Sequence, residues 1–231
     1  MTTSLVHFEL RGAVAWVTLN DGKANALSPS LIAQLDAALD RVEAEAKAVV
    51  IAGQPGRFCA GYDLKIMMSG KAAASDLVAT GCELMARLYC LSVPVVIACT
   101  GHAMAGGALL LLCGDRRLGI SGAFKIGLNE VRIGIPLPAF GLDLARDRLD
   151  PRKLTAATVC SEIFNPEGAV EAGFLDVLVA ADALEAQAQA EAEALAQLSR
   201  SAFTKTKRGL RQVTADRMVA EVRGNLDDLL G

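Results

Sequence analysis

The first half of the chain alternates short apolar strands with helices, and this alternation indicates the fold class. Strands are expected at Val6–Leu10, Ala13–Leu19, Ala48–Ala52 and Val95–Ala98, and around Arg117–Ile120. Helices are expected from Ser28-Pro29, where Ser28 is the cap and Pro29 the first helical residue, over Ser75–Leu91, and from Gly106-Gly107 to Cys113. Strands that alternate with helices are typical of α/β domains. The sequence therefore predicts an α/β fold.

The end of the chain differs in composition from this first part. From Pro151 onward the sequence is mostly helical in pattern, and Asp182–Leu198 is rich in Ala, Glu and Gln, with Asp182 as the expected cap. A last helix is expected over Thr214–Leu230. The change in composition near residue 181 predicts a core of residues 1–180 followed by a helical region of residues 181–231.

Composition narrows the classes of function. The 231 residues are 52% hydrophobic with a mean hydropathy of +0.36, which is enough to bury a sizeable core. A formal net charge of −3 argues against a nucleic-acid partner. The N-terminus has no secretory pattern, and the longest apolar run, Ala108–Cys113, is too short to span a bilayer, so no membrane partner is expected.

Six cysteines are present, and none of them forms a C-x-x-C pair. The two histidines do not stand near them at zinc-finger spacing, so no metal site is expected. Buried free thiols are typical of a reducing compartment, which makes the expected location cytoplasmic. The cysteines are Cys59, Cys82, Cys90, Cys99, Cys113 and Cys160.

A run of small residues leads directly into an apolar helix at Gly101–Leu112. Glycines at Gly106 and Gly107 let a ligand approach the backbone closely, because no Cβ stands in the way. The first amides of a helix lack intrahelical partners and carry a partial positive charge. This junction is therefore a candidate for holding a negatively charged oxygen, whereas neither phosphate-loop pattern, G-x-x-x-x-G-K-[ST] or G-x-G-x-x-G, is present.

Several segments, taken together and in order, resemble the crotonase superfamily, the enoyl-CoA hydratase/isomerase group. The motifs are closest to those of the mitochondrial-type Δ3,Δ2-enoyl-CoA isomerases. The resemblance implies a spiral of ββα units with a C-terminal helical region that covers the CoA site or forms trimers. It further implies an acyl-CoA thioester substrate, a homotrimer or dimer of trimers, and no separate cofactor, because coenzyme A enters with the substrate. The segments are Lys23–Ser28, Arg57–Lys65, Pro94–Asp115, Gly127–Gly134 and Pro166–Asp176.

The resemblance also implies how the chemistry is divided among residues. The backbone amides of Tyr62 and Gly106 would hold the oxygen of a thioester enolate. Of the two glutamates that the family's hydratases use, the first falls on Leu109, which can neither bind water nor transfer a proton. The second falls on Glu130, which would carry a proton from C2 to C4 as the sole shuttle of an isomerase.

Two alternatives to the isomerase stay open at this point. An enoyl-CoA hydratase would add water with Glu130 alone, or with Asp143 as a second acid. A non-catalytic subunit would bind acyl-CoA without turning it over.

An apolar environment would raise the pKa of a base at position 130 and favour the isomerase. The residues expected to supply this environment are Leu109, Ile133, Ile135 and Leu137.

Other residues are candidates for binding the substrate. Lys23 and Lys65 match basic positions near the CoA nucleotide, and Ala60 would offer its carbonyl to the adenine amine. Met67, Leu109 and Leu137 would contact the acyl part of the substrate. Asp63 belongs to the same segment as Lys65, although a cap of a turn or helix is its more ordinary role.

His102 is expected to make a local hydrogen bond. The basic run Lys205, Lys207, Arg208 and Arg211 is expected to be a solvated helix face, with phosphate contact as the alternative.

Overall fold

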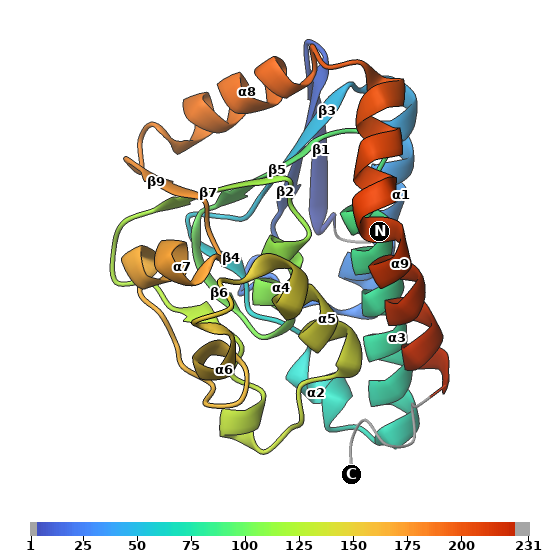
Figure 1. Ribbon diagram of the computed structural model, residues 1–231, viewed down its shortest axis with the longest axis vertical. Helices are drawn as coiled ribbons and strands as arrows, with labels where there is room; N and C mark the ends of the chain where they lie inside the picture. The colour runs from blue at the N-terminus through green and yellow to red at the C-terminus, as the bar shows by residue number, and fades with distance from the viewer. Residues whose placement is uncertain (1–3, 225–231) are drawn as a thin grey trace.

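The computed structural model describes residues 4–224 and arranges the strands of the core in two sheets (Figure 1). The larger sheet has the order β1-β2-β3-β5-β7-β9, in which only β1 and β2 are antiparallel. All four strands expected before residue 100 are present, and their boundaries differ from expectation by one residue at most. The strands are β1 (Val6–Arg11), β2 (Val14–Leu19), β3 (Ala48–Ala52), β5 (Val95–Cys99), β7 (Arg116–Ile120) and β9 (Val177–Val179).

A smaller parallel sheet consists of β4 (Gly56–Cys59), β6 (Gly101–Met104) and β8 (Ile126–Gly127). Consecutive strands join different sheets: β3 is followed by β4, β5 by β6, and β7 by β8. Each pair leads into helical segments, so the chain winds as a spiral of ββα turns, which confirms the expected fold. The main helices that follow the pairs are α3 (Lys71–Tyr89), α4 (Gly106–Leu112) and α5 (Ala139–Arg148).

The central strands of the large sheet, such as β3 and β5, are buried on both faces. In β3, Val49 and Ile51 belong to the core formed with α1 (Pro29–Glu45), whereas Val50 faces the opposite way, toward α8 (Leu184–Leu195). Successive side chains of a strand point to opposite faces, so a strand covered by helices on both sides has an unbroken apolar sequence. Figure 1 shows α8 on one side of the sheet and α1, α3 and α9 (Arg200–Gly224) along the other.

The helix boundaries follow local signals where such signals exist. The hydroxyl of Ser28 accepts a hydrogen bond from the Leu31 amide at 3.2 Å, so the expected cap of α1 is confirmed. The helix expected from Ser75 begins earlier, at Lys71. Asp182 does not cap α8, because that helix begins at Leu184 after Ala183. The remaining short helices are α2 (Leu64–Met67), η1 (Val131–Ile133), α6 (Leu154–Ala157) and α7 (Pro166–Ala172).

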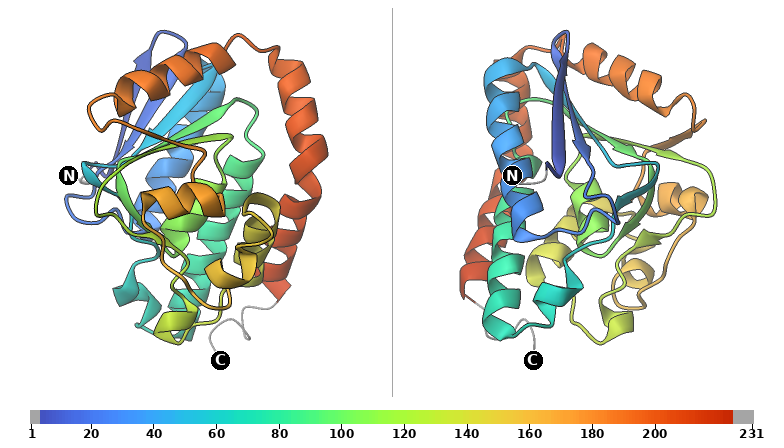
Figure 2. Two further views of the ribbon diagram at one scale, coloured as in Figure 1. Left: turned by 60° about the vertical axis from the view of Figure 1, so that its left-hand side comes forward. Right: turned by 180° about the vertical axis from the view of Figure 1, so that it is seen from behind.

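The last helix, α9, spans Arg200–Gly224 and starts 14 residues before the expected Thr214. It lies along α3 and α5, as the two views in Figure 2 show. Its first half contains basic and polar residues rather than an apolar stripe, which is why sequence periodicity did not reveal it. The part of the expected helix beyond residue 224 lies outside the described residues.

Two general features follow from the described residues 4–224. None of the helices there has the length and hydropathy needed to cross a membrane. All six cysteines are free thiols, and five of them are buried, while Cys160 is exposed. Burial raises the pKa of the Cys59 thiol to about 12, so this cysteine stays protonated and is a poor nucleophile.

Candidate active site

Glu130 lies in the wall of a largely apolar cavity of about 170 Å³. The residue directly precedes the 3-10 turn η1, and only 8% of its surface is exposed. Its Oε2 atom is buried and has no hydrogen-bond partner within the described part of the chain. The other residues that line the cavity are Ala60, Tyr62, Leu64, Met67, Val78, Ala105, Asn129, Ile133, Ile135, Pro136 and Pro138.

The surroundings of Glu130 change its acidity. Burial removes water from the carboxylate, and this desolvation raises the pKa of Glu130 from 4.5 to about 7. Ile133 and Ile135, two of the four residues expected to supply this apolar environment, do line the cavity. A carboxyl group with a pKa near neutrality takes up and releases protons readily at physiological pH.

The two segments predicted to hold an oxyanion lie against each other. A Cβ built on Gly61 would stand 3.1 Å from the amide nitrogen of Gly106, and one built on Gly107 would stand 2.1 Å from the carbonyl oxygen of Cys59. Within residues 4–224, neither the Tyr62 amide nor the Gly106 amide donates a hydrogen bond to a backbone carbonyl. Tyr62 lines the cavity, and so does Ala105, whose carbonyl belongs to the peptide that carries the Gly106 amide.

Ala105, which directly precedes Gly106, has an unusual backbone conformation. Its φ is 51° and its ψ is −126°, a combination that normally requires glycine. Such strain costs about 1–3 kcal/mol and persists only where the surroundings enforce it. Here the amide of Ala105 donates to the carbonyl of Gly127 at 2.9 Å, and its carbonyl accepts from Leu109 at 3.0 Å. These bonds join β8 to α4 and orient the peptide that carries the Gly106 amide.

Two residues expected to contact substrate lie behind the cavity wall. Leu109 is 1% exposed and packs with Leu137 around Gly141, where a Cβ would meet the Cδ1 atom of each leucine at 3.2 Å. Neither leucine is among the described residues that line the cavity. The structure therefore corrects the expectation for both, because Leu109 and Leu137 pack around Gly141 instead of lining the cavity in the described chain.

Asp143, the candidate second acid, is bound by two arginines and is not part of the described cavity lining. Its Oδ2 accepts a hydrogen bond from Arg217 of α9 at 2.6 Å, and its Oδ1 accepts one from Arg146 at 3.4 Å. Asp143 is 3% exposed and is absent from the cavity lining in the described chain. This placement gives Asp143 a structural role between α5 and α9, contrary to the expectation of a second acid.

The residues predicted to bind coenzyme A have mixed placements. Ala60 and Met67 line the cavity. Asp63 accepts a hydrogen bond from the Lys65 amide at 2.9 Å, so it caps α2, in keeping with its more ordinary role. The side chains of Lys23 and Lys65 are exposed on the surface, and their contact with phosphates stays a prediction.

Sequence reasoning missed several residues of the cavity, among them Asn129 and Val78. Asn129 has a buried Oδ1 atom with no hydrogen-bond partner in the described chain, next to the candidate base. Its place directly before Glu130 in the sequence is the only signal that pointed to it. Val78 comes from the middle of α3, and no local pattern distinguishes it from other core residues of that helix.

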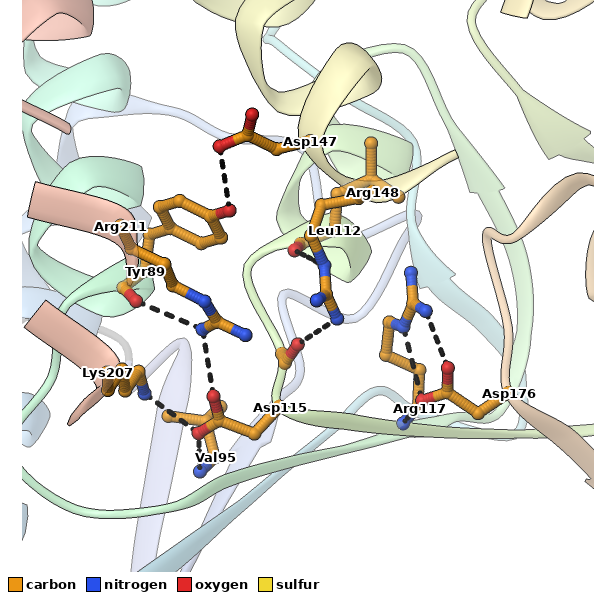
Figure 3. Close-up of polar contacts among 11 residues, drawn as sticks. Tyr89, Val95, Leu112, Asp115, Arg117, Asp147, Arg148, Asp176, Lys207 and Arg211 are labelled. Atoms are coloured by element: carbon orange, nitrogen blue, oxygen red, sulfur yellow. Dashed lines mark hydrogen bonds and ion pairs between the residues drawn. The ribbon is translucent and has the colours of Figure 1, made fainter. Parts of the chain in front are cut away.

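The basic run of α9 is not the solvated face that was expected. Lys207 and Arg211 are buried, and both bind Asp115, at 2.7 Å and 2.8 Å respectively (Figure 3). The same carboxylate accepts a hydrogen bond from the Val95 amide at 2.8 Å. The structure therefore corrects the expectation for these two residues, whereas Lys205 and Arg208 are exposed.

His102 lies near the site without taking part in it. Its Nδ1 accepts a hydrogen bond from the Lys125 amide at 2.9 Å, and its ring packs edge-on against Phe124. The imidazole thus joins β6 to the segment before β8, which confirms the expected local hydrogen bond. It is not among the described residues that line the cavity.

Comparisons with known proteins agree with this architecture. The enoyl-CoA hydratase/isomerase family model matches residues 9–229. A crystal structure of a family member from Pseudomonas syringae is 43% identical with a TM-score of 0.95, covering 98% of each chain. An enoyl-CoA hydratase from Mycobacterium ulcerans is 34% identical with a TM-score of 0.93, covering 99% of this chain and 100% of that one. The mitochondrial enoyl-CoA delta isomerase 1 of Mus musculus is 28% identical over 97% of this chain and 79% of its own length. The chain belongs to the enoyl-CoA hydratase/isomerase family and is an enzyme of the crotonase superfamily.

Proposed function

We propose that the protein is a Δ3,Δ2-enoyl-CoA isomerase in which Glu130 is the one side chain that carries the proton. A single observation carries this proposal. Glu130 is the only carboxylate that lines the apolar cavity within the described residues, and burial raises its pKa to about 7. Moving a double bond needs one base that removes a proton and returns it to another carbon, and no bound water is consumed.

The reaction divides into two proton transfers. Glu130 removes a proton from C2, between the thioester and the double bond, which leaves a dienolate with negative charge on the thioester oxygen. The amides of Tyr62 and Gly106 donate hydrogen bonds to that oxygen, and one such donor is worth about 3 kcal/mol in the transition state. The protonated Glu130 then delivers the proton to C4, so the base ends in its starting state.

A hydratase is the second candidate, because relatives with either name are similar to this chain. Adding water to a 2-enoyl thioester needs a position for the water as well as a proton donor. Leu109 stands where the resemblance places the first hydratase glutamate, and Asp143 is bound by two arginines. These placements favour the isomerase. Assembly as a homotrimer or a dimer of trimers, and a cytoplasmic location, are part of the proposal.

The experiment compares two reactions and two variants. We expect the unsubstituted enzyme to isomerise 3-hexenoyl-CoA and to hydrate crotonyl-CoA far more slowly. Glu130→Gln removes the proton carrier and keeps the shape, so isomerisation should fall by about 10²–10⁴-fold. Glu171→Gln, at an exposed glutamate of α7, is the matched control.

Three results would contradict the proposal. Isomerisation that persists undiminished in Glu130→Gln would exclude Glu130 as the base. Hydration of crotonyl-CoA faster than isomerisation would assign the chain to the hydratases. Binding of acyl-CoA without turnover of any enoyl, hydroxyacyl or malonyl thioester, as followed by mass spectrometry, would identify a non-catalytic subunit.

A further inference from the structure

The cavity beside Glu130 has an exposed part and an enclosed part. Leu64 and Ile133 line it and are 60% and 50% exposed, so the cavity reaches the surface between α2 and η1. Tyr62 and Val78 also line the cavity and are enclosed, since Val78 is 2% exposed and the hydroxyl of Tyr62 is buried. An acyl group that enters from the surface therefore advances toward the ring of Tyr62.

The ring of Tyr62 fills a gap that two glycines leave open. A Cβ built on Gly81 of α3 would stand 2.5 Å from both Cε1 and Oη of Tyr62, and one built on Gly106 would stand 3.1 Å from Cδ2 and Cε2. Both distances are shorter than ordinary van der Waals contact. The ring is therefore held between α3 and α4, and its position depends on the absence of a side chain at position 81.

The hydroxyl of Tyr62 belongs to the wall and not to the binding space. Its oxygen is buried and has no hydrogen-bond partner in the described part of the chain. Burial also raises the pKa of this phenol well above its ordinary value, so it stays neutral. Burying a hydroxyl without a partner is unfavourable. The hydroxyl of Tyr62 forms no hydrogen bond within the described chain. We therefore attribute the effect of Tyr62 on the substrate to the volume of its ring.

We propose that the Tyr62 side chain, seated on Gly81, ends the acyl cavity and restricts the enzyme to short acyl chains of about six carbons. The proposal rests on the proposed function only in that an acyl thioester occupies the cavity. A cavity of about 150 Å³ holds a six-carbon ring, and the space beside Glu130 is about 170 Å³. Tyr62 thus has two separate roles, a backbone amide for the thioester oxygen and a side chain that selects length.

The test measures binding of saturated acyl-CoA by calorimetry, since no double bond and no proton transfer are then involved. The probes are butanoyl-, hexanoyl- and decanoyl-CoA. Each additional buried methylene strengthens binding about fourfold. In the unsubstituted protein, hexanoyl-CoA should therefore bind about sixteenfold more tightly than butanoyl-CoA, whereas decanoyl-CoA should bind no more tightly than hexanoyl-CoA.

The variants move the end of the cavity in opposite directions. Tyr62→Leu shortens the side chain, so decanoyl-CoA should gain about tenfold over hexanoyl-CoA. Gly81→Ala pushes the ring into the cavity, so hexanoyl-CoA should lose at least about fourfold against butanoyl-CoA. Tyr62→Phe keeps the ring and should keep the ratio of the decanoyl and hexanoyl affinities. Circular dichroism melting establishes that each variant is folded, and Gly81→Ala provides the test should Tyr62→Leu not fold.

The outcomes separate this inference from the proposed reaction. An unchanged decanoyl-to-hexanoyl ratio in folded Tyr62→Leu, or an unchanged hexanoyl-to-butanoyl ratio in Gly81→Ala, overturns the inference. Tight binding of decanoyl-CoA by the unsubstituted protein, or no binding of any of the three thioesters, also overturns it. If the ratios shift as expected while 3-hexenoyl-CoA is not isomerised, the length selection stands and the reaction assignment fails.

Discussion

Asp115 accepts a hydrogen bond from Lys207 at 2.7 Å, which joins the loop after α4 to the middle of α9. Arg211, one turn further along α9, binds the other oxygen of the same carboxylate at 2.8 Å. In Figure 3 both basic side chains point from α9 toward Asp115, which also accepts from the Val95 amide. This buried cluster fixes the C-terminal helix to the start of β5 and to the end of α4.

Removing Asp115 should therefore destabilise the fold. Asp115→Ala leaves two buried cations without their partner, and breaking a buried ion pair in this way costs about 3–5 kcal/mol. Thermal and urea unfolding should show this loss. Glu45→Ala is the control, since Glu45 pairs with the exposed Arg41 on the surface of α1 and its loss should change the free energy of unfolding little. Equal stability of the two variants would contradict the role assigned to Asp115.

The rate of isomerisation should depend on pH through Glu130. The base acts when it is ionised, and burial raises the pKa of Glu130 to about 7. We therefore expect kcat/KM for 3-hexenoyl-CoA to rise tenfold per pH unit below about pH 7 and to level off above it. A profile that is flat between pH 5 and 8 would show that another group limits the rate.

The same carboxylate should make the enzyme less stable as the pH rises. The pKa of Glu130 is higher in the folded than in the unfolded chain, so the folded state holds the proton more tightly and loses stability between about pH 4.5 and pH 7. Glu130→Gln cannot ionise and should avoid this loss. We expect the variant to gain up to about 3 kcal/mol over the unsubstituted protein at pH 8, and little at pH 4. Unfolding in urea at the two pH values measures the difference, and a gain that is the same at both would contradict it.

The start of α4 should tolerate no side chain at position 107. A Cβ on Gly107 would stand 2.1 Å from the carbonyl oxygen of Cys59, so Gly107→Ala must move the segment that carries the Tyr62 amide. We expect a loss of stability of about 1–3 kcal/mol and a fall in kcat. Gly209→Ala is the matched control, since nothing lies within 4 Å of its Cβ position in α9. That change should stabilise the protein by about 0.5–1 kcal/mol, because glycine is unfavourable inside a helix.

Some elements were predictable because their signals are local. Ser28 and Pro29 mark the start of α1, and the unbroken apolar run Ala48–Ala52 matches β3. The strands of the small sheet were not predicted, because β4 and β6 have four residues each and β8 has two. Strands this short contain too few residues for a periodic pattern of apolar and polar side chains. They form only when segments that are distant in the sequence pair in parallel.

The residues of the candidate site were likewise predictable only in part. Glu130, Tyr62 and Gly106 were identified through the motifs that contain them, and the structure brings their segments to one cavity. Leu109 was expected at the cavity because it falls on the position of the first hydratase glutamate, and Leu137 because it follows Glu130 closely in the sequence. Neither reason determines the direction of a side chain. Both instead pack around Gly141, behind the wall.

The sequence by itself determined the α/β class, the family and the identity of the candidate base. These follow from periodicity and from ordered motifs, which are properties of the chain and need no coordinates. Only the tertiary structure decided the acidity of Glu130, because its pKa is raised by the apolar residues that several distant segments place around it. The fold likewise determined that Lys207 and Arg211 bind Asp115 rather than face solvent, since burial and charge pairing arise only when α9 lies against the core.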